Sequence, residues 1–232
     1  MTVENNIMLR AIIFDLDNTL IDFLTFKKET AKAAAKAMIK QGLPSDEIQA
    51  YGKIFSVYQE KGIEYQKTFH DVIEPYKLEI NTAERIQQAA IVAYLKKKFE
   101  VLKPYPMVKP VLEKLRQRYK LAIVTDAPRN KAWQRLVITG LENEFDFVIT
   151  HQDTLEEKPH PSPFYLALKK LNVLAPACLF VGDNPDRDIK GAKELGMMTC
   201  WAKYGSLRKE SEADFEIGSI EELVKKIEQA SL

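Results

Sequence analysis

The sequence predicts an α/β protein whose parallel sheet is interrupted by a helical insertion. Short apolar runs alternate with helix-like segments over the second half of the chain, which is typical of a parallel sheet covered by helices on both faces. A similar apolar run, residues 10–15, lies near the start of the chain. Between the two, residues 22–103 have a helical pattern and contain no convincing strand.

The helical block contains recognisable helix ends. Residues 25–40 are rich in Ala, Lys and Glu and stop before Gly42, which is a favourable residue after the end of a helix. Ser45, followed by two acidic residues, predicts the N-cap of a second helix. Thr82 predicts the N-cap of a third helix that runs to about residue 99.

Two boundaries divide the chain. Three prolines within residues 103–110 indicate a linker or domain boundary. We therefore expect one domain formed by residues 8–21 and 104–232, and a second formed by residues 22–103. Because Met8 lies just before the first expected strand, residues 1–7 are predicted to be a disordered extension or to reflect a misjudged start of the chain. Because ligands of open α/β sheets bind outside the carboxyl ends of the strands, the insertion after residue 21 is expected to act as a lid.

The remaining elements follow the same alternation. The expected strands are residues 119–125, 145–150, 178–182 and 197–202. Four helices are expected among these strands. The first follows the strand at residues 119–125 and ends at about Gly140, the second spans residues 163–171, the third spans residues 186–195, and the last begins at Ile220.

Composition narrows the function classes. The chain has 232 residues with 34 Lys and Arg against 33 Asp and Glu, so its net charge is +1. This balance argues against nucleic-acid binding, which usually needs a basic excess. The two cysteines, Cys178 and Cys200, lie in apolar runs and are expected to be buried in strands. No apolar run approaches the roughly 20 residues of a membrane helix, and the N-terminus lacks a signal peptide pattern, so a soluble cytoplasmic protein is expected.

The first polar motif follows the first expected strand. Asp15 and Asp17 lie two residues apart, so their side chains can point into one site. Two close carboxylates raise the pKa of one of them or require a cation, and hard cations such as Mg²⁺ prefer oxygen ligands. The pair also suits a nucleophile beside an acid/base residue. The alternative interpretation is a turn with an Asx cap.

Two further positions could contact an anion. Thr125 and Asp126 follow the second expected strand, where a hydroxyl and free backbone N–H groups can hold phosphoryl oxygens, although a plain helix cap is an alternative. Lys158 precedes a proline-rich segment that fixes the chain before a helix, although it could instead be a solvated loop lysine.

The last motif follows the strand at residues 178–182. Gly182 is expected to permit a tight turn, and Asp183 could supply a further metal ligand. Asp188 is expected to orient the metal ligands by accepting a hydrogen bond nearby. Asp186 is expected to be the N-cap of the next helix.

Together these motifs resemble those of the haloacid dehalogenase-like (HAD) superfamily of hydrolases, subfamily I, with a Rossmann-like core and a helical C1-type cap inserted after the first motif. The matching residues are Asp15, Asp17, Thr19, Thr125, Lys158, Asp183 and Asp188. The resemblance extends over the chain from Met8.

The resemblance implies a Mg²⁺-dependent phosphatase, a phosphoric monoester hydrolase. In this family the residue matching Asp15 attacks phosphorus and forms an aspartyl-phosphate. The residue matching Asp17 protonates the leaving group and then deprotonates the hydrolytic water. The residue matching Lys158 stabilises the charge of the transferring group.

The resemblance also implies the ligand sets. Thr125 and Asp126, with Lys158, are expected to bind phosphate. The metal is expected on the Asp15 carboxylate, the backbone carbonyl of Asp17 and the carboxylate of Asp183.

Within the superfamily, Asp17 favours phosphate ester hydrolysis. Haloacid dehalogenases lack this second Asp because a halide leaving group needs no proton. Phosphohexose mutases have it but also carry a His shortly afterwards, and residues 20–26 contain none. Dehalogenation, phosphomutase activity and a non-catalytic regulatory domain remain the alternatives.

The expected partner is a small-molecule phosphate ester, with no nucleic acid and no membrane, and the protein is expected to be a monomer or homodimer. Subgroups with this architecture act on glyceraldehyde 3-phosphate, phosphoglycolate, sugar phosphates or nucleotides. The sequence leaves this choice open, as well as the lid residues that contact the substrate.

Overall fold

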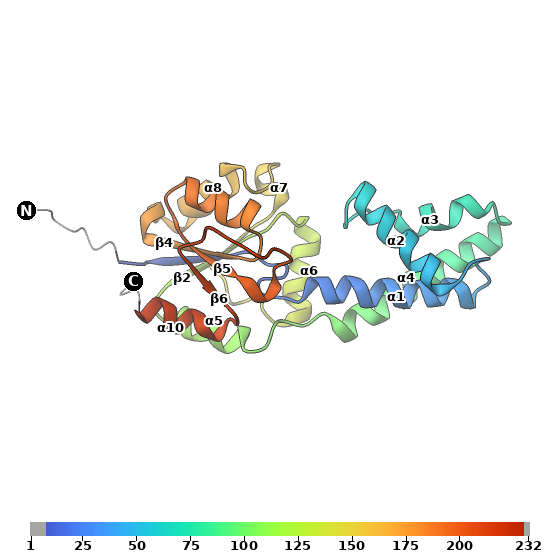
Figure 1. The fold of residues 1–232 in the computed structure, drawn as a ribbon, viewed down its shortest axis with the longest axis horizontal. Coiled ribbons are helices and arrows are strands. Elements are labelled where there is room, and N and C mark those ends of the chain that lie inside the picture. Colours follow the sequence, from blue (N-terminus) through green and yellow to red (C-terminus); the bar gives the residue numbers. More distant parts are fainter. Residues whose placement is uncertain (1–7, 230–232) are drawn as a thin grey trace, which may run out of the picture. The chain divides into compact units, whose positions relative to one another are not determined.

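The computed structural model describes residues 8–229, so the predicted extension at residues 1–7 lies outside the described residues. The chain divides into two compact units. One, which we call the core unit, comprises Met1–Asp22 with Lys103–Leu232, and the other, the inserted unit, comprises Phe23–Leu102. Figure 1 shows the elements of each unit.

The core unit is built on a six-stranded sheet in the order β3-β2-β1-β4-β5-β6. All five neighbouring pairs are parallel. The strands are β1 (Ala11–Phe14), β2 (Lys120–Val124), β3 (Phe147–Ile149), β4 (Cys178–Gly182), β5 (Met198–Ala202) and β6 (Phe215–Ile217). The predicted α/β fold with a parallel sheet is therefore confirmed.

The strand register aligns the predicted site residues. Phe14, the last residue of β1, pairs with Ile123 of β2 and with Val181 of β4. Because the strands are parallel, their carboxyl ends meet at one edge of the sheet. The residues that follow β1, β2 and β4 are Asp15, Thr125 and Asp183, so the topology brings all three to this edge.

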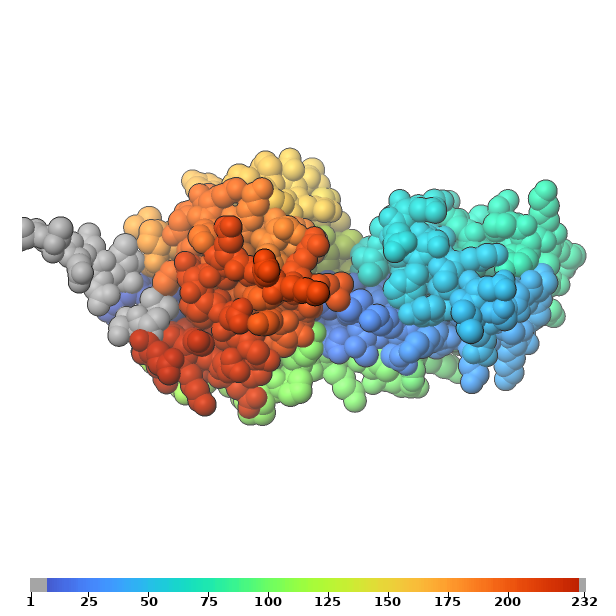
Figure 2. Space-filling model, in the orientation of Figure 1, coloured from blue at the N-terminus to red at the C-terminus, as the bar shows by residue number. Residues whose placement is uncertain are grey.

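Helices cover both faces of this sheet. Figure 1 shows α7 and α8 on one side and α5 and α10 on the other. Helix α8 packs its buried Phe164 against Phe180 of β4, with ring centroids 5.0 Å apart. The helices of the core unit are α5 (Val108–Leu115), α6 (Arg129–Thr139), α7 (His151–Thr154), α8 (Pro161–Leu171), α9 (Lys190–Glu194) and α10 (Glu221–Gln229). Short helical turns are η2 (Ala175–Ala177), η3 (Pro185–Ile189) and η4 (Lys203–Gly205). The dark red atoms on the surface in Figure 2 belong to the α10 region.

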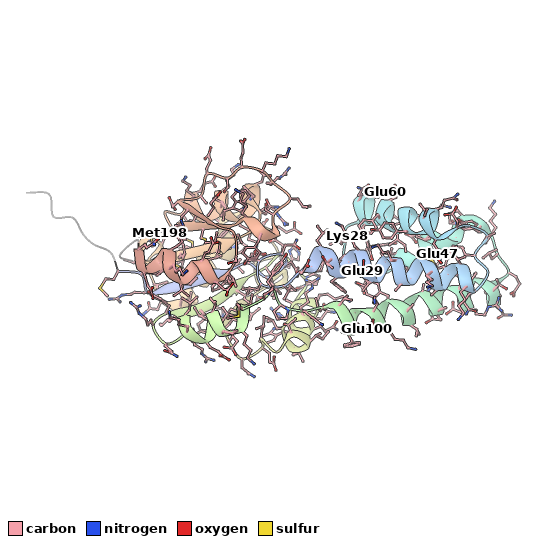
Figure 3. The ribbon with its side chains drawn as sticks, turned by 60° about the horizontal axis from the view of Figure 1, so that its bottom comes forward. Lys28, Glu29, Glu47, Glu60, Glu100 and Met198 are labelled. Atoms are coloured by element: carbon pink, nitrogen blue, oxygen red, sulfur yellow. The ribbon has the colours of Figure 1, made fainter. Side chains whose placement is uncertain are left out.

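The inserted unit is helical and has its own apolar core. Its elements are α1 (Phe23–Lys40), α2 (Glu47–Lys61), α3 (Thr68–Ile73), η1 (Glu74–Tyr76) and α4 (Ile80–Val101). Buried residues from each of its α-helices form one cluster, which includes Met38, Ile54 and Ile86. Charged side chains such as those of Glu47 and Glu60 lie on the outside (Figure 3).

Three predicted helix caps are wrong, each by one to three residues. Asp46 rather than Ser45 caps α2, because its carboxylate accepts a hydrogen bond from the backbone N of Gln49 at 2.8 Å. A carboxylate is a stronger acceptor than a hydroxyl at the positive end of a helix. In the same way, the side chain of Glu79 accepts from the backbone N of Thr82 at the start of α4.

The third cap belongs to η3, a π-helical turn that continues directly into α9. Asn184 caps it rather than Asp186, since the Asn184 side chain accepts from the backbone N–H groups of Asp186 and Arg187. Asp186 is instead exposed and pairs with Arg208 at 2.6 Å.

Helix α5 and strand β6 are not predicted from the sequence. Helix α5 begins inside the segment whose prolines indicate a linker or boundary, with Pro110 in its first turn, where a backbone N–H has no helical partner to lose. Strand β6 is a three-residue edge strand, too short for a strand pattern to show. Among residues 8–229, no helix is both long enough and apolar enough to cross a membrane.

Candidate active site

The site is organised around a buried lysine. Lys158 is 3% exposed. Its Nζ lies 2.6 Å from Oδ1 of Asp15 and 2.7 Å from Oδ1 of Asp188. It also donates to the backbone carbonyl of Val124, the last residue of β2, at 3.0 Å. The alternative of a solvated loop lysine is therefore excluded, since this ammonium is held inside the core unit.

Three buried carboxylates gather around this lysine. Asp15, Asp183 and Asp188 each offer a carboxylate oxygen, and these atoms lie within 4.8 Å of one another. Burial raises the pKa of Asp15, with Asp188 and Asp17 adding to the effect and Lys158 opposing it. Burial also raises the pKa of Asp183, and the charges of Asp15 and Asp188 raise it further. The cluster therefore carries more negative charge than Lys158 compensates.

This donor set fits the expected magnesium ion. The three grouped residues offer only carboxylate oxygens, which are the ligands that a hard divalent cation prefers. The raised pKa values of Asp15 and Asp183 have the sign expected where a cation would relieve mutual repulsion.

The same carboxylates keep Lys158 positively charged. Burial alone would lower its pKa, but the neighbouring carboxylates, above all Asp15 and Asp188, hold the pKa of Lys158 above its usual value. The ammonium is therefore a fixed positive charge beside the end of β1.

Asp15 is also held from its other oxygen. The hydroxyl of Thr19 donates to Oδ2 of Asp15 at 3.2 Å, and both side chains are buried. With Lys158 on Oδ1 and Thr19 on Oδ2, the orientation of the Asp15 carboxylate is fixed.

The turn after β2 carries Thr125 and Asp126. The hydroxyl oxygen of Thr125 accepts from the backbone N of Ala127 at 3.2 Å, which leaves its proton able to point toward a ligand. The carboxylate of Asp126 accepts from the backbone N of Lys158 at 3.0 Å and from Arg187 at 3.1 Å. The Asp126 side chain thus holds the segment that carries Lys158.

Asp17 differs in environment from Asp15. Its Oδ2 accepts from Nη1 of Arg135, in helix α6, at 2.6 Å. Its side chain is 22% exposed, whereas that of Arg135 is 3% exposed. The two carboxylates of the first motif are therefore bound to two different cations, Lys158 and Arg135.

Residue 182 must be a glycine because the Asp188 side chain packs directly against it. A Cβ atom at this position would lie 2.5 Å from the Cβ and Oδ2 atoms of Asp188. Asp188 approaches this closely because its Oδ2 accepts from the backbone N of Asn184 at 3.0 Å. The glycine thus lets Asp188 reach Lys158, which is a different reason from the predicted tight turn.

Comparison with known proteins decides the family. A family model described as haloacid dehalogenase-like hydrolase matches residues 12–202. The chain belongs to the haloacid dehalogenase-like hydrolase family. The predicted family membership is thereby confirmed.

Relatives of this HAD hydrolase match it over most of its length. A glyceraldehyde 3-phosphate phosphatase of Methanocaldococcus jannaschii is 34% identical over 221 residues, which cover 94% of this chain and 96% of that protein. A protein of the same name from Pyrococcus abyssi is 36% identical over 199 residues, covering 85% and 83% of the two chains. The crystal structure of a HAD phosphatase from Thermococcus onnurineus has a TM-score of 0.71 and 27% identity, and covers 94% of this chain and 98% of that one.

These matches confirm the predicted HAD-like fold and enzyme class, a phosphoric monoester hydrolase. Within this HAD hydrolase, the structure brings Asp15, Lys158, Asp183 and Asp188 into one cluster. Thr125 follows β2, the strand that pairs with β1, and Asp15 follows β1. The individual roles of these residues stay predictions.

Two residues that contact the first motif are not predicted from the sequence, Arg135 and Tyr204. Arg135 gave no signal, because it stands in a polar helix segment and is buried only through tertiary packing. Tyr204 was missed as well, and its hydroxyl donates to the backbone carbonyl of Thr19 at 2.6 Å. Tyr204 follows an apolar strand and precedes Gly205. A tyrosine and a glycine directly after a strand are the sequence signal that could have indicated this contact.

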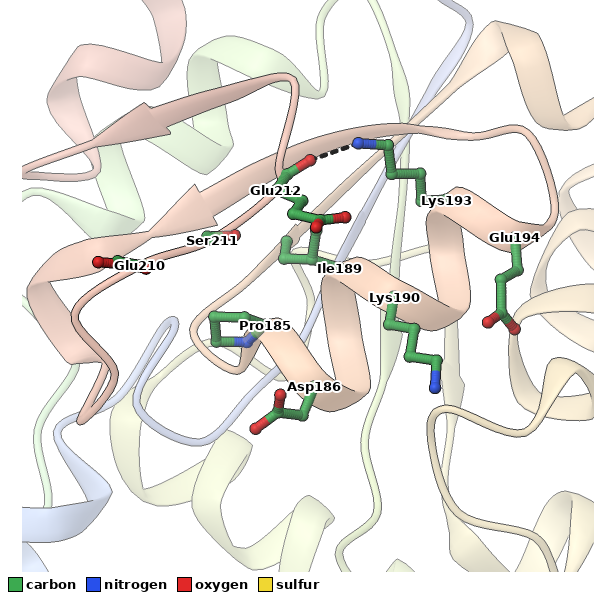
Figure 4. A pocket seen from close by; sticks show the side chains of 9 residues that line it. All are labelled: Pro185, Asp186, Ile189, Lys190, Lys193, Glu194, Glu210, Ser211 and Glu212. Atoms are coloured by element: carbon green, nitrogen blue, oxygen red, sulfur yellow. Dashed lines mark hydrogen bonds between the residues drawn. The ribbon is translucent and has the colours of Figure 1, made fainter.

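A cavity of about 690 Å³ lies beside η3 and α9 (Figure 4). None of the predicted site residues lines this cavity. Its charged lining residues are of both signs, with Lys190 and Lys193 against Asp186, Glu194, Glu210 and Glu212. The figure shows the one hydrogen bond drawn among them, from Lys193 to the backbone carbonyl of Glu212.

Proposed function

We propose that this HAD hydrolase is a Mg²⁺-dependent phosphatase that cleaves a small phosphate monoester through a covalent intermediate on Asp15. The observation that carries the proposal is the buried ammonium of Lys158, which contacts Asp15 and Asp188 at 2.6 and 2.7 Å beside the carboxylate of Asp183. Such a fixed cation beside an oriented carboxylate suits the attack of one anion on another.

Asp15 is the proposed nucleophile. One of its carboxylate oxygens attacks phosphorus, the bond from phosphorus to the ester oxygen breaks, and the phosphoryl group is bound to Asp15. Water then attacks the same phosphorus, the bond to Asp15 breaks, and inorganic phosphate leaves. The contacts from Lys158 and Thr19 support this role because they fix the carboxylate before the substrate arrives.

Asp17 is the proposed acid and base. In the first step it gives a proton to the leaving oxygen, and in the second it takes a proton from the attacking water. Its position two residues after Asp15 places it at the same edge of the sheet. This residue also supports phosphate ester hydrolysis over dehalogenation, since a halide leaves without a proton.

Thr125 and Lys158 are the proposed phosphoryl ligands. The Thr125 hydroxyl and the backbone N–H groups of the turn that follows β2 would donate to phosphoryl oxygens. The Asp126 carboxylate already accepts hydrogen bonds from the backbone N of Lys158 and from the guanidinium of Arg187. We therefore assign the contribution of Asp126 to phosphate binding to its backbone N–H.

The carboxylates of Asp15 and Asp183, with the backbone carbonyl of Asp17, would hold Mg²⁺. When bound, this ion would neutralise charge on the phosphoryl oxygens and reduce the repulsion between the substrate and Asp15. Asp188 would stay outside this set, because its two oxygens already contact Lys158 and the backbone N of Asn184.

Glyceraldehyde 3-phosphate is the substrate that we propose. The support is the name of relatives that match over most of their own length, among them the Methanocaldococcus jannaschii and Pyrococcus abyssi proteins. We further propose that the inserted unit acts as the lid that selects this substrate, since the core unit holds all the residues assigned to the chemistry.

The test is a set of initial-rate measurements with p-nitrophenyl phosphate and glyceraldehyde 3-phosphate, with Mg²⁺ and with excess chelator. We expect metal-dependent turnover by the wild type and a loss of at least about a thousandfold in Asp15→Asn, because the nucleophile is removed. Asp186→Asn is the matched control, because Asp186 follows the same strand as Asp183 but is exposed and pairs with Arg208.

Equal rates for Asp15→Asn and Asp186→Asn would refute the assignment of the nucleophile. A panel containing phosphoglycolate, a hexose phosphate and a nucleoside monophosphate tests the substrate separately. A higher kcat/KM for any of these three than for glyceraldehyde 3-phosphate would replace the proposed substrate without affecting the site.

A further inference from the structure

Arg135 is a buried cation that contacts the proposed acid/base residue. It lies in helix α6 and its side chain is 3% exposed. Its Nη1 donates to Oδ2 of Asp17 at 2.6 Å, which is a short, charge-assisted hydrogen bond. The two residues are 118 positions apart in sequence, so only the fold brings them together.

Burial of the Arg135 side chain favours this contact. A guanidinium removed from water is costly unless a carboxylate compensates it, so the folded chain strongly favours the paired arrangement. The backbone of the first motif is fixed separately, because the backbone N of Asn18 donates to the carbonyl of Ile21 at 2.8 Å. What Arg135 adds is the orientation of the Asp17 side chain itself.

Helix α6 gives this contact a rigid base. It begins at Arg129, shortly after the turn that carries Thr125, and Arg135 stands on its second turn. The hydroxyl of Thr139 donates to the backbone carbonyl of Arg135 at 2.7 Å, one turn further along. The same helix therefore follows the proposed phosphoryl-binding turn and holds the proposed acid/base residue.

We propose that Arg135 is a positioning residue: by holding Oδ2 it orients the Asp17 side chain so that the protonated carboxyl group can pass its proton to the leaving oxygen. This inference rests on the proposed function of Asp17. In the step concerned, the bond from phosphorus to the ester oxygen breaks as the proton moves from Asp17 to that oxygen. Without Arg135, Asp17 is present but misplaced, so the defect grows with the need of the leaving group for a proton.

The test uses phenyl phosphate and 2,4-dinitrophenyl phosphate, which share an aryl shape but differ in the basicity of the leaving oxygen. The quantity measured is kcat/KM, which reports the steps up to transfer of the phosphoryl group. For Arg135→Met we expect a loss of about tenfold to a hundredfold with phenyl phosphate and about threefold or less with the dinitro compound. Arg135→Lys should recover part of the loss, because it keeps the charge but not the planar fork.

Asp17→Asn separates this inference from the proposed function. If Asp17 is the acid, Asp17→Asn shows the same dependence of kcat/KM on the leaving group. Adding Arg135→Met to Asp17→Asn then lowers kcat/KM little further, because both substitutions remove the same function. If Asp17→Asn shows no such dependence on the leaving group, the proposed role of Asp17 fails. If Asp17→Asn shows this dependence but Arg135→Met does not, the positioning role of Arg135 is overturned.

Arg129→Met is the matched control. Arg129 is the same residue type on the same helix, but its side chain is 54% exposed and pairs with Asp153 at 2.7 Å. We expect both aryl phosphates to be hydrolysed by this variant at wild-type rates. An equal loss with both substrates in Arg135→Met, accompanied by a lowered melting temperature, would show a purely structural role and overturn the inference.

Discussion

The Nζ atom of Lys158 contacts the carboxylates of Asp15 and Asp188 and a backbone carbonyl at the end of β2. Its contribution to stability follows from its burial. Its side chain is 1% exposed, so the ammonium and the carboxylates of Asp15 and Asp188 compensate one another's lost hydration. Removing one partner of such a pair leaves the other charges buried without compensation.

Lys158→Met should therefore destabilise the protein by about 3–5 kcal/mol, because two buried carboxylates lose their counterion. Urea denaturation at neutral pH in the presence of chelator measures this loss. Lys120→Met is the control, since the Nζ of Lys120 donates to the neutral carbonyl of Leu171, and its loss should be about 1 kcal/mol. Equal destabilisation by the two substitutions would contradict the compensation argument.

Asp183 gives a second prediction at the scale of the residue. Saturating Mg²⁺ should raise the melting temperature of the wild type by roughly 5–10 °C, because an ion that binds only the folded state stabilises it. Asp183→Asn should lose most of this gain, since a neutral amide is a weaker metal ligand than a carboxylate. Differential scanning fluorimetry with and without Mg²⁺ checks both, and an undiminished gain in Asp183→Asn would remove Asp183 from the metal ligands.

At the scale of elements, the turn after β5 supports the loop after β1. The hydroxyl of Tyr204 donates to the carbonyl of Thr19, and a Cβ atom on Gly205 would lie 1.6 Å from the carbonyl oxygen of Asn18. The ring of Tyr204 packs edge-on against Tyr105, with centroids 4.9 Å apart. The η4 turn thus determines where the first motif lies, although no residue of η4 is assigned to the chemistry.

Gly205→Ala should lower stability by about 1–3 kcal/mol and reduce kcat, because the backbone at Asn18 must move to admit a methyl group. Thermal unfolding and turnover of p-nitrophenyl phosphate measure the two effects. Gly52→Ala is the control, since Gly52 lies in helix α2 and a Cβ there meets no atom within 4 Å. It should be neutral or stabilising by up to about 1 kcal/mol. A Gly205→Ala variant with wild-type stability and turnover would contradict this reading of η4.

At the scale of the whole molecule, the two places where the chain leaves and re-enters the core unit lie side by side. Ile21 forms an antiparallel bridge with Pro104, and the backbone N of Tyr105 donates to the carbonyl of Leu20 at 2.9 Å. The inserted unit therefore departs from two neighbouring chain ends, which makes its removal compatible with the sheet.

Replacing residues 23–102 by a short Gly-Ser linker should leave a core unit that unfolds cooperatively, because the sheet and its apolar core lie within that unit. Circular dichroism during heating tests this. If the inserted unit selects the substrate, the variant should keep measurable hydrolysis of p-nitrophenyl phosphate but lose its preference for glyceraldehyde 3-phosphate. An unchanged preference would assign selection to the core unit.

The sequence predicted the elements whose signal is local. Strand β4 was predicted with its observed bounds, because its residues form an uninterrupted buried run ended by a glycine. Helix α5 was not recognised, because Pro104, Pro106 and Pro110 suggested a linker although the last of them is tolerated in a first helical turn. The caps of α2, α4 and η3 were displaced because several polar residues compete there and the chain geometry chooses among them.

The sequence by itself determined the α/β fold class and the candidate site residues at the strand ends. This was possible because parallel strands bring their carboxyl ends to one edge, so polar residues after apolar runs must meet. Only the tertiary structure decided that Lys158 is buried between Asp15 and Asp188, and that Arg135 holds Asp17. The contacts of Asp15 with Lys158 and of Asp17 with Arg135 join residues more than a hundred positions apart. The desolvation that makes all three contacts strong arises only when the elements pack.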